Sequence, residues 1–510
     1  MRVEAFRGLS VRGLLAAALA VSCLAACGRL RSATPLAVTL DRIPTTLDPH
    51  HHNEIVGWSL LCNFYDAPVR FSPEMRIEPA LAESWKVLDG NRVRFSLRRG
   101  VRFSNGERFT SADVVTSFDR ALHDPLSKVR HHLVGIRSVT ADGDGAVVVE
   151  TDSPSPTLLN RLAFLFIVPH RQAALPEIER PVGTGPYRFV KRGQDGSVVA
   201  EGWESWRGVP EVRRVVFSFV ENEDKRSDLF VAGGVDVSYR LVDDVLPEMQ
   251  RHPGLRAKQQ PYMMVQLLVV NPQAATGDAR RALADPRVRR AMLMAIDRDR
   301  LVGQVFRGNG AVASQYVHPV VFGYDTGVSP VPYDLPQARR LIAEAGFRDG
   351  FAVQLTHGSV APAYVSALVE DLGRLGVRVT TRAFGLAELL QRARAGELPL
   401  FTIGRSCTTG DASEFLDSSI HTKDAVRGLG LENYSGFSDA ETDALLEAAD
   451  TEMDSGLRLA RLRQAQRRAL AALPILPLTI KSEFVGLSDR IDIPVRFDGW
   501  MWAAGFRWAR

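Results

Sequence analysis

Two short runs in the sequence carry side chains of the kind that bind metal ions. Residues 50–52 are three consecutive histidines, whose imidazole nitrogens suit transition metals, and residues 142–145 read Asp-Gly-Asp-Gly, which suits calcium. Adjacent histidines on a loop rarely converge on one ion, and the acidic run lacks the distal glutamate of a complete calcium loop. A solvated or cleft-lining loop and a tight turn are the better interpretations, so we predict no metal site.

Signatures of catalysis are missing from the sequence. It contains no G-x-S-x-G nucleophile turn, no H-E-x-x-H zinc helix, no C-x-x-C pair and no phosphate-binding P-loop. The glycines at 183 and 185 are followed at once by Pro186, which argues against a helix N-terminus that holds phosphate. The pattern favours a binding protein, not an enzyme, and predicts no cofactor.

The first 26 residues are typical of a secretory signal. A basic start with Arg2, Arg7 and Arg12 precedes an apolar run at 14–26, which is shorter than the ~20 residues that span a bilayer. The run ends in Leu-Ala-Ala before Cys27, which resembles a bacterial lipobox, where the chain is cut before the cysteine and the cysteine is acylated. We therefore predict a signal peptide at 1–26, a lipid on Cys27 and a polar tether at 27–34. The alternative is a plain secretory signal with a chance cysteine.

The predicted export signal also bears on whether the remaining cysteines can form a disulfide. Only Cys62 and Cys407 are left in the folded body, and an exported chain meets an oxidising compartment. They form either one disulfide or two separate buried thiols, because the sequence does not show whether their Cα atoms lie within bonding distance.

Local patterns indicate the elements that must position a site. Alternating charged and apolar residues predict a strand at 92–97. Strand patterns at 351–355 and 377–381 flank a helical pattern at 363–375, which predicts a β-α-β unit and an α/β protein of more than one lobe. A long helix is expected at 455–473. Capping patterns mark four helix starts, at Thr110 with Asp113, Asp285 with Pro286, Asp334 with Pro336, and Ser438 with Glu441.

The composition is that of a folded globular protein. The chain has 510 residues, 45% of them apolar, which excludes a disordered or fibrous chain and suggests two or three domains. The 63 basic and 59 acidic residues leave a formal net charge of +4, so nucleic acid is not an expected partner.

Short landmarks follow one another along nearly the whole chain after the signal. They are Leu-Asp-Pro at 47–49, Pro-Ala-Leu-Ala-Glu-Ser-Trp at 79–85, the run at 95–107, Gly-Thr-Gly-Pro-Tyr at 183–187, Asp-Pro-Arg-Val-Arg-Arg-Ala at 285–291, Asn-Tyr-Ser-Gly-Phe at 433–437 and Ile-Leu-Pro-Leu at 475–478. In type and order they resemble the family 5 extracellular solute-binding proteins, the oligopeptide and dipeptide receptors of ABC importers.

The resemblance implies a periplasmic-binding-protein fold of type II, an α/β clamshell whose two large lobes close by hinge motion. Lobe one would comprise residues 33–75, 184–268 and 478–510, and lobe two residues 269–477. An additional subdomain of lobe one would comprise residues 76–183.

The same resemblance implies a function. The protein would capture oligopeptides, or related small polar solutes, and deliver them to the permease and ATPase subunits of an importer. It would work as a lipid-anchored monomer on the periplasmic or extracytoplasmic face of the membrane. The alternatives are a binding protein for an opine, a sugar or an acidic solute, a sensing or chaperone module without import, and an exported hydrolase.

By resemblance, two segments line the cleft. The segment after residues 47–49 points to His52, Asn53 and Glu54 as ligand contacts, with a surface loop as the alternative.

The second segment, residues 404–415, departs from the peptide receptors. They carry a tryptophan and then an aspartate that pairs with the ligand's ammonium group, and these positions fall here on Arg405 and Thr408. Arg405 would suit a carboxylate or phosphate, or else a salt bridge between the lobes. The second acid of the pattern is kept as Asp411, which would serve the amine after a one-residue shift, or else cap a helix.

Overall fold

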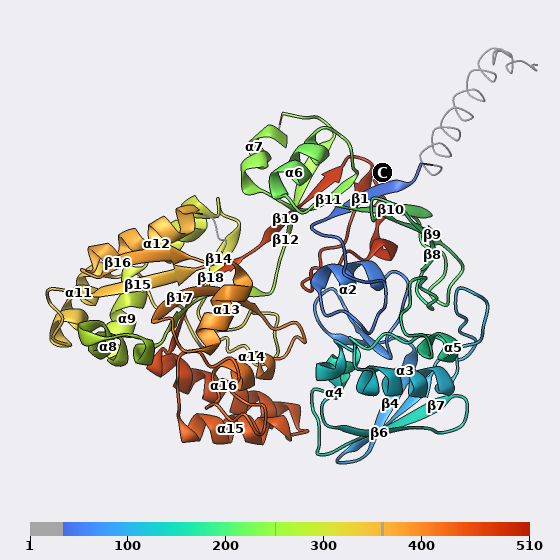
Figure 1. Ribbon diagram of the computed structural model, residues 1–510, viewed down its shortest axis with the longest axis horizontal. Helices are drawn as coiled ribbons and strands as arrows, with labels where there is room; N and C mark the ends of the chain where they lie inside the picture. The colour runs from blue at the N-terminus through green and yellow to red at the C-terminus, as the bar shows by residue number, and fades with distance from the viewer. Residues whose placement is uncertain (1–33, 250, 359–361, 510) are drawn as a thin grey trace, which may run out of the picture.

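The computed structural model describes residues 34–249, 251–358 and 362–509. Figure 1 shows two bodies side by side, joined where strands β12 and β19 lie, with a smaller sheet beneath the right-hand body. The predicted signal peptide, Cys27 and nearly all of the tether lie outside the described residues. Within these ranges, no helix combines the length and apolar character needed to cross a bilayer.

Lobe one is built on a seven-stranded sheet in the order β12-β19-β11-β1-β10-β9-β8. The apolar strand β1 pairs in parallel with β10 and β11, and the outer pairings are antiparallel. The strands are β1 (Leu36–Leu40), β8 (Tyr187–Arg192), β9 (Val198–Gly202), β10 (Arg214–Phe219), β11 (Val237–Leu241), β12 (Leu255–Gln260) and β19 (Glu483–Ser488). The helices of this lobe include α2 (Ile55–Leu61), α6 (Glu223–Val231) and α7 (Leu246–Met249).

The extra subdomain is a four-stranded antiparallel sheet in the order β4-β5-β7-β6, against which α3 packs. Its elements are β4 (Ala82–Asp89), β5 (Arg92–Leu97), α3 (Ser111–His123), β6 (Ile136–Ala141), β7 (Ala146–Thr151), α4 (Leu158–Leu162) and α5 (His170–Ala173). Strand β5 has the predicted bounds. Helix α3 starts as predicted, because the backbone N–H of Thr110 donates to the Asp113 carboxylate at 2.8 Å. A short 3-10 turn, η1 (Arg130–Leu133), follows α3.

Lobe two is built on a six-stranded sheet in the order β14-β18-β13-β17-β15-β16. The predicted β-α-β unit is confirmed, since β15 pairs in parallel with β16 and α12 lies between them in the chain. The strands are β13 (Met264–Val270), β14 (Gly310–Val312), β15 (Ala352–His357), β16 (Arg378–Ala383), β17 (Leu400–Ser406) and β18 (Ile475–Lys481). The helices are α8 (Gly277–Ala284), α9 (Pro286–Ala295), α10 (Arg298–Arg300), α11 (Leu335–Glu344), α12 (Pro362–Arg374), α13 (Leu386–Arg394), α14 (Ser413–Ser419), α15 (Ala440–Asp450) and α16 (Ser455–Ala472).

The helix caps of lobe two follow the sequence with one shift. Asp285 caps α9 and Asp334 caps α11, as predicted. Helix α15 is capped by Asp439, one residue after the predicted Ser438. The Asp439 carboxylate accepts from the backbone N–H of Thr442 at 3.1 Å, and the Ser438 hydroxyl is instead hydrogen-bonded to a loop threonine.

Two crossings join the lobes, at residues 261–263 between β12 and β13 and at Ser482 between β18 and β19. The sheets divide the chain at these crossings and not at the predicted 268 and 478, because β13 and β18 pair along their length within the six-stranded sheet. An apolar run predicts a strand but not the sheet in which it pairs. Since β12 also pairs with β19, the two crossings lie side by side and form one hinge.

Candidate functional site

The loop after β1 is anchored to α3 by a buried ion pair. The Asp48 carboxylate accepts hydrogen bonds from both terminal nitrogens of Arg120, at 2.8 and 2.6 Å, and both side chains are buried. Burial raises the pKa of Asp48, but the hydrogen bond and charge of Arg120 and the other donors outweigh it, so the pKa lies below its ordinary value. This pair fixes the loop against the extra subdomain.

The first two of the three adjacent histidines, His50 and His51, contact different partners. Nε2 of His50 lies 2.8 Å from the carbonyl oxygen of Phe166, and its Nδ1 lies 3.0 Å from Arg120. These contacts suit a neutral ring with its proton on Nε2, and burial lowers the pKa of His50 to about 4. Nε2 of His51 lies 2.7 Å from the carboxylate of Asp124. Across the described ranges, no three His, Cys, Asp or Glu side chains are arranged to hold a metal ion.

The structure separates the three loop residues that the sequence grouped as ligand contacts. The ring of His52 is buried, with its centroid 4.5 Å from that of Trp58. A Cβ at Gly57 would come within 2.3 Å of its Nδ1, so the loop packs closely only because that residue is glycine. Glu54 occupies the N-cap position of α2. Asn53 is exposed and lines the cavity described next.

A cavity of about 110 Å³ lies where the two lobes and the extra subdomain meet. We call it the interlobe cavity. It is lined from lobe one by Asn53, Ile55, Trp58, Asp498 and Trp500, from the extra subdomain by His131, His132 and Phe164, from the first crossing by Tyr262 and Met263, and from lobe two by Ser406 and Thr408.

Aromatic rings form much of the cavity wall. The rings of Trp58 and Trp500 stack 6.0 Å apart, and those of His132 and Phe164 stack 4.4 Å apart. Burial holds the pKa of His132 well below its ordinary value, so this imidazole is neutral at physiological pH. Flat apolar faces with a few neutral hydrogen-bonding groups suit an amphipathic organic ligand.

Charge within the lining is already balanced. Asp498 is the acid among the lining residues, and it accepts from Nε of Arg496 at 3.0 Å and from the backbone N–H of Trp500 at 3.0 Å. Asp498 therefore holds the segment that carries Trp500 in place.

Strand β17 brings lobe two to the cavity. It pairs with β13 from end to end, but with β15 only at Leu400 and Phe401. From Thr402 to Ser406, its other edge has no strand partner in the part of the chain that the structure describes. Because Ser406 lines the cavity, an unpaired strand edge, which can accept another extended backbone, ends at the site.

The residues after β17 combine a cavity-facing hydroxyl with a carboxylate behind it. Thr408 lines the cavity, and its hydroxyl donates to Glu414 at 3.0 Å. The backbone N–H and the hydroxyl of Thr409 also donate to Glu414, at 2.8 and 2.7 Å. Of this group, Thr408, which lines the cavity, is among the candidates that the sequence predicts, but Glu414 is not.

Arg405 and Asp411 are engaged within lobe two. Arg405 forms an ion pair with Glu432, and both residues belong to lobe two, so this pair is not the salt bridge between the lobes that stands as the alternative to a ligand role. Asp411 is buried, and Arg458 donates to its two carboxylate oxygens at 2.6 and 2.8 Å. Asp411 also accepts from the backbone N–H of Ser413, the first residue of α14, at 3.0 Å, although the N-cap position of this helix is occupied by Ala412.

The two cysteines are separate free thiols, so the predicted alternative of a disulfide is not found. Cys62 follows α2 in lobe one and Cys407 follows β17 in lobe two, and both are buried. Burial raises the pKa of both thiols. A bond between them would tie together two lobes that the chain joins only through the hinge.

The aromatic wall is the part of the site that the sequence did not reveal. Trp58, Phe164 and Trp500 come from three distant segments, and none lies in a pattern that marks a binding residue.

Comparison with known proteins identifies this architecture. Residues 76–426 match the model of the bacterial extracellular solute-binding proteins, family 5. The chain belongs to this family. It is therefore a solute-binding protein, from a family of binding proteins without catalysis.

Two relatives and one solved structure show the extent of the similarity. The heme-binding protein A of Haemophilus influenzae is 28% identical over 453 residues, which cover 81% of each chain. The di/tripeptide-binding protein 2 of Pseudomonas aeruginosa is 26% identical, covering 87% of this chain and 89% of the relative. The crystal structure of the ABC transporter substrate-binding protein CtaP from Listeria monocytogenes matches with a TM-score of 0.83 at 17% identity, covering 94% of this chain and 99% of the other. The predicted two-lobed α/β fold is confirmed.

Proposed function

We propose that this family member captures short peptides in the interlobe cavity and delivers them to the permease and ATPase subunits of an importer. The observation that carries the proposal is the unpaired edge of β17, which ends at the cavity at Ser406. An extended peptide of any sequence can pair its backbone with such an edge, because the hydrogen bonds involve main-chain atoms. The name of the Pseudomonas relative, a di/tripeptide-binding protein, supports the same ligand class.

The proposed anchor for the peptide's ammonium group is the pair of Thr408 and Glu414. The carboxylate of Glu414 lies 3.0 Å from the hydroxyl of Thr408, beside the position where peptide receptors carry an aspartate. A charge-assisted hydrogen bond in a closed cavity is the interaction expected to hold an amine. Arg405 is paired with Glu432, which weighs against the alternative of an acidic solute.

Isothermal titration of the purified chain without its signal, using di- and tripeptides and their N-acetylated forms, tests the proposal. We expect free peptides to bind, and Glu414→Gln to weaken them about tenfold, about 1.4 kcal/mol. Acetylated peptides lack the charge, so their weaker binding should be unaffected by the substitution. Glu388→Gln on the exposed face of α13 is the matched control.

Two results would contradict the proposal. If Glu414→Gln lowers the affinity for free and acetylated peptides equally, Glu414 does not bind the peptide's ammonium group. Binding of hemin, tested because the Haemophilus relative is named for heme, with no binding of any peptide would reject the peptide assignment.

We also propose that the protein acts outside the cytoplasm as a monomer held to the membrane by a lipid on Cys27. The lipobox-like sequence before Cys27 and the membership of an extracellular family support this.

A further inference from the structure

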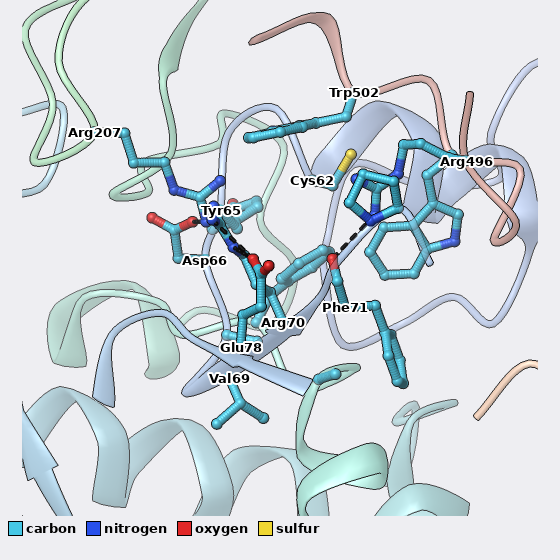
Figure 2. Close-up of a pocket in the computed structure, with 15 residues that line it drawn as sticks. Cys62, Tyr65, Asp66, Val69, Arg70, Phe71, Glu78, Arg207, Arg496 and Trp502 are labelled. Carbon is cyan, nitrogen blue, oxygen red and sulfur yellow. Dashed lines mark hydrogen bonds and ion pairs between the residues drawn. The ribbon is translucent and has the colours of Figure 1, made fainter. Parts of the chain in front are cut away.

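A second cavity lies in lobe one, directly beside the interlobe cavity. It has a volume of about 80 Å³, several times the ~15 Å³ needed to hold one water molecule. Trp500 lines both cavities, so they adjoin at this residue. Figure 2 shows the second cavity, with Trp502 at one end and the sulfur of Cys62 beside it. We call it the lobe-one cavity.

The walls of the lobe-one cavity are mainly apolar. Buried side chains from β2 (Val69–Phe71), from the preceding loop and from the segment after α4 face it. They include Ala67, Val69, Phe71, Ala163 and Phe166.

The arginines of the lobe-one cavity are each paired with an acid. Nη2 of Arg70 lies 3.1 Å from Glu78, and Arg207 pairs with Asp66, as Figure 2 shows. Arg496 pairs with Asp498, the acid of the interlobe cavity. A charged group that entered would lose its hydration without gaining a free counter-charge.

The same guanidinium groups surround one aromatic ring. Arg70, Arg207 and Arg496 lie 5.6, 5.3 and 5.7 Å from the ring centroid of Trp502. This packing holds Trp502 and the arginines in place at one end of the cavity. The cavity therefore combines rigid walls, an apolar surface and balanced charge.

We propose that the lobe-one cavity receives an apolar side chain, aliphatic or aromatic, of the peptide held in the interlobe cavity. The proposal rests on the proposed function, because the occupant is part of the same ligand. Its basis is adjacency, since Trp500 lines both cavities and a side chain that passes the edge of its ring would reach the lobe-one cavity. Burial of a large apolar side chain there makes apolar peptides the preferred ligands.

The test compares peptide affinities in the unaltered protein and in variants whose larger side chains fill the lobe-one cavity. Calorimetric affinities are compared for trialanine and for tripeptides with one leucine, phenylalanine or lysine at each position. In the unaltered protein we expect at least one leucine or phenylalanine peptide to bind about tenfold or more tightly than trialanine, and no lysine peptide to do so. Ala163→Leu and Ala67→Leu, each made singly, should abolish this preference and leave trialanine affinity unchanged.

Two outcomes would overturn the proposal, and they differ in what they mean for the peptide function. If trialanine binds but neither leucine nor phenylalanine improves affinity, or if both filled variants keep the preference, the cavity is not a side-chain pocket and the peptide function stands. If no peptide binds the unaltered protein, the peptide function and this inference fall together.

Cys62 provides a second measurement that does not depend on the filling variants. In a Cys407→Ala chain it is the remaining thiol of the folded body, and it lines the cavity. The reaction of Cys62 with methyl methanethiosulfonate is followed by mass spectrometry on a preparation that starts after Cys27. We expect a saturating preferred peptide to slow this reaction about tenfold more than saturating trialanine does. Equal slowing by both peptides would mean that lobe closure alone shields the thiol, and would contradict occupancy of the cavity.

Discussion

Asp411 and Arg458 form an ion pair inside lobe two. They form two hydrogen bonds in a buried position, and the guanidinium also lies 5.3 Å from the ring centroid of Phe322. A carboxylate held in this way has little to offer a ligand, although its place in the sequence resembles that of a ligand-binding acid. The partner, 47 residues away, decides its role.

We predict that Asp411→Ala lowers the free energy of unfolding by about 3–5 kcal/mol, because it leaves the Arg458 charge buried without a partner. Urea denaturation measures the effect, and the ligand affinity of the folded fraction should stay within about twofold of the original. The double variant Asp411→Leu with Arg458→Met should recover part of the loss. Unchanged stability together with a tenfold loss of affinity would instead make Asp411 a ligand contact.

At the scale of elements, helices α14 and α15 share a buried acidic pair. Asp417 on α14 and Asp450 at the end of α15 interact by a hydrogen bond, which requires that one carboxyl keeps a proton. Burial, and then the nearby charge of Asp450, raise the pKa of Asp417 well above its ordinary value. Burial also raises the pKa of Asp450, so the pair favours a state in which the two carboxyls together keep one proton.

The pair predicts how stability depends on pH. The folded state keeps one proton on the pair of Asp417 and Asp450 that the unfolded chain releases above about pH 4. This contribution to stability is therefore present at low pH and is lost as pH rises through the raised pKa of the folded pair. We expect Asp417→Asn to raise the free energy of unfolding at pH 8 by about 1 kcal/mol or more and to change it less at pH 5. Thermal denaturation across this range tests it, with the exposed Asp119→Asn as control. An equal change at both pH values would show that no proton is shared.

At the scale of the whole molecule, the lobes touch across the cleft as well as through the hinge. The side-chain amide of Asn160, after the start of α4, donates to the carbonyl oxygen of Thr409 at 2.7 Å. Since Thr409 adjoins the cavity-lining Thr408, this hydrogen bond closes the cleft next to the site.

We predict that Asn160→Ala shifts the protein toward the open form. Loss of one hydrogen bond of about 1 kcal/mol changes the balance between closed and open forms, and therefore ligand affinity, by about fivefold. Small-angle scattering should show a larger radius of gyration without ligand and a normal value at saturating ligand. Gln391→Ala, on the exposed face of α13, is the control. An unchanged radius and affinity would show that the contact does not hold the lobes together.

The position of the molecule in the cell gives the last prediction. Cys27→Ser should move the exported protein from the membrane fraction to the soluble fraction, because the thiol that would carry the lipid is removed. Fractionation and intact mass measure the change. A protein that was soluble before the substitution, with no lipid mass, would support the plain secretory signal.

Local elements and family membership could both be predicted from the amino-acid sequence. The caps at Asp285 and Asp334, the alternating strand at 92–97 and the β-α-β unit around α12 depend on residues close together in the chain, and the structure has them. The order of the family's landmarks was likewise readable without coordinates, and the family is confirmed.

Which of the candidate side chains line the cavity became clear from the folded structure alone. Thr408 and Asn53 line the cavity, whereas Arg405, Asp411 and His52 are engaged elsewhere or packed away from it. Whether a polar side chain faces a cleft depends on the partners that folding brings beside it, and ion pairs or stacked rings between distant segments leave no periodic trace in the sequence. The two cysteines could likewise be assigned as separate thiols, and Trp500 as a residue that lines two cavities, only after the lobes were in place.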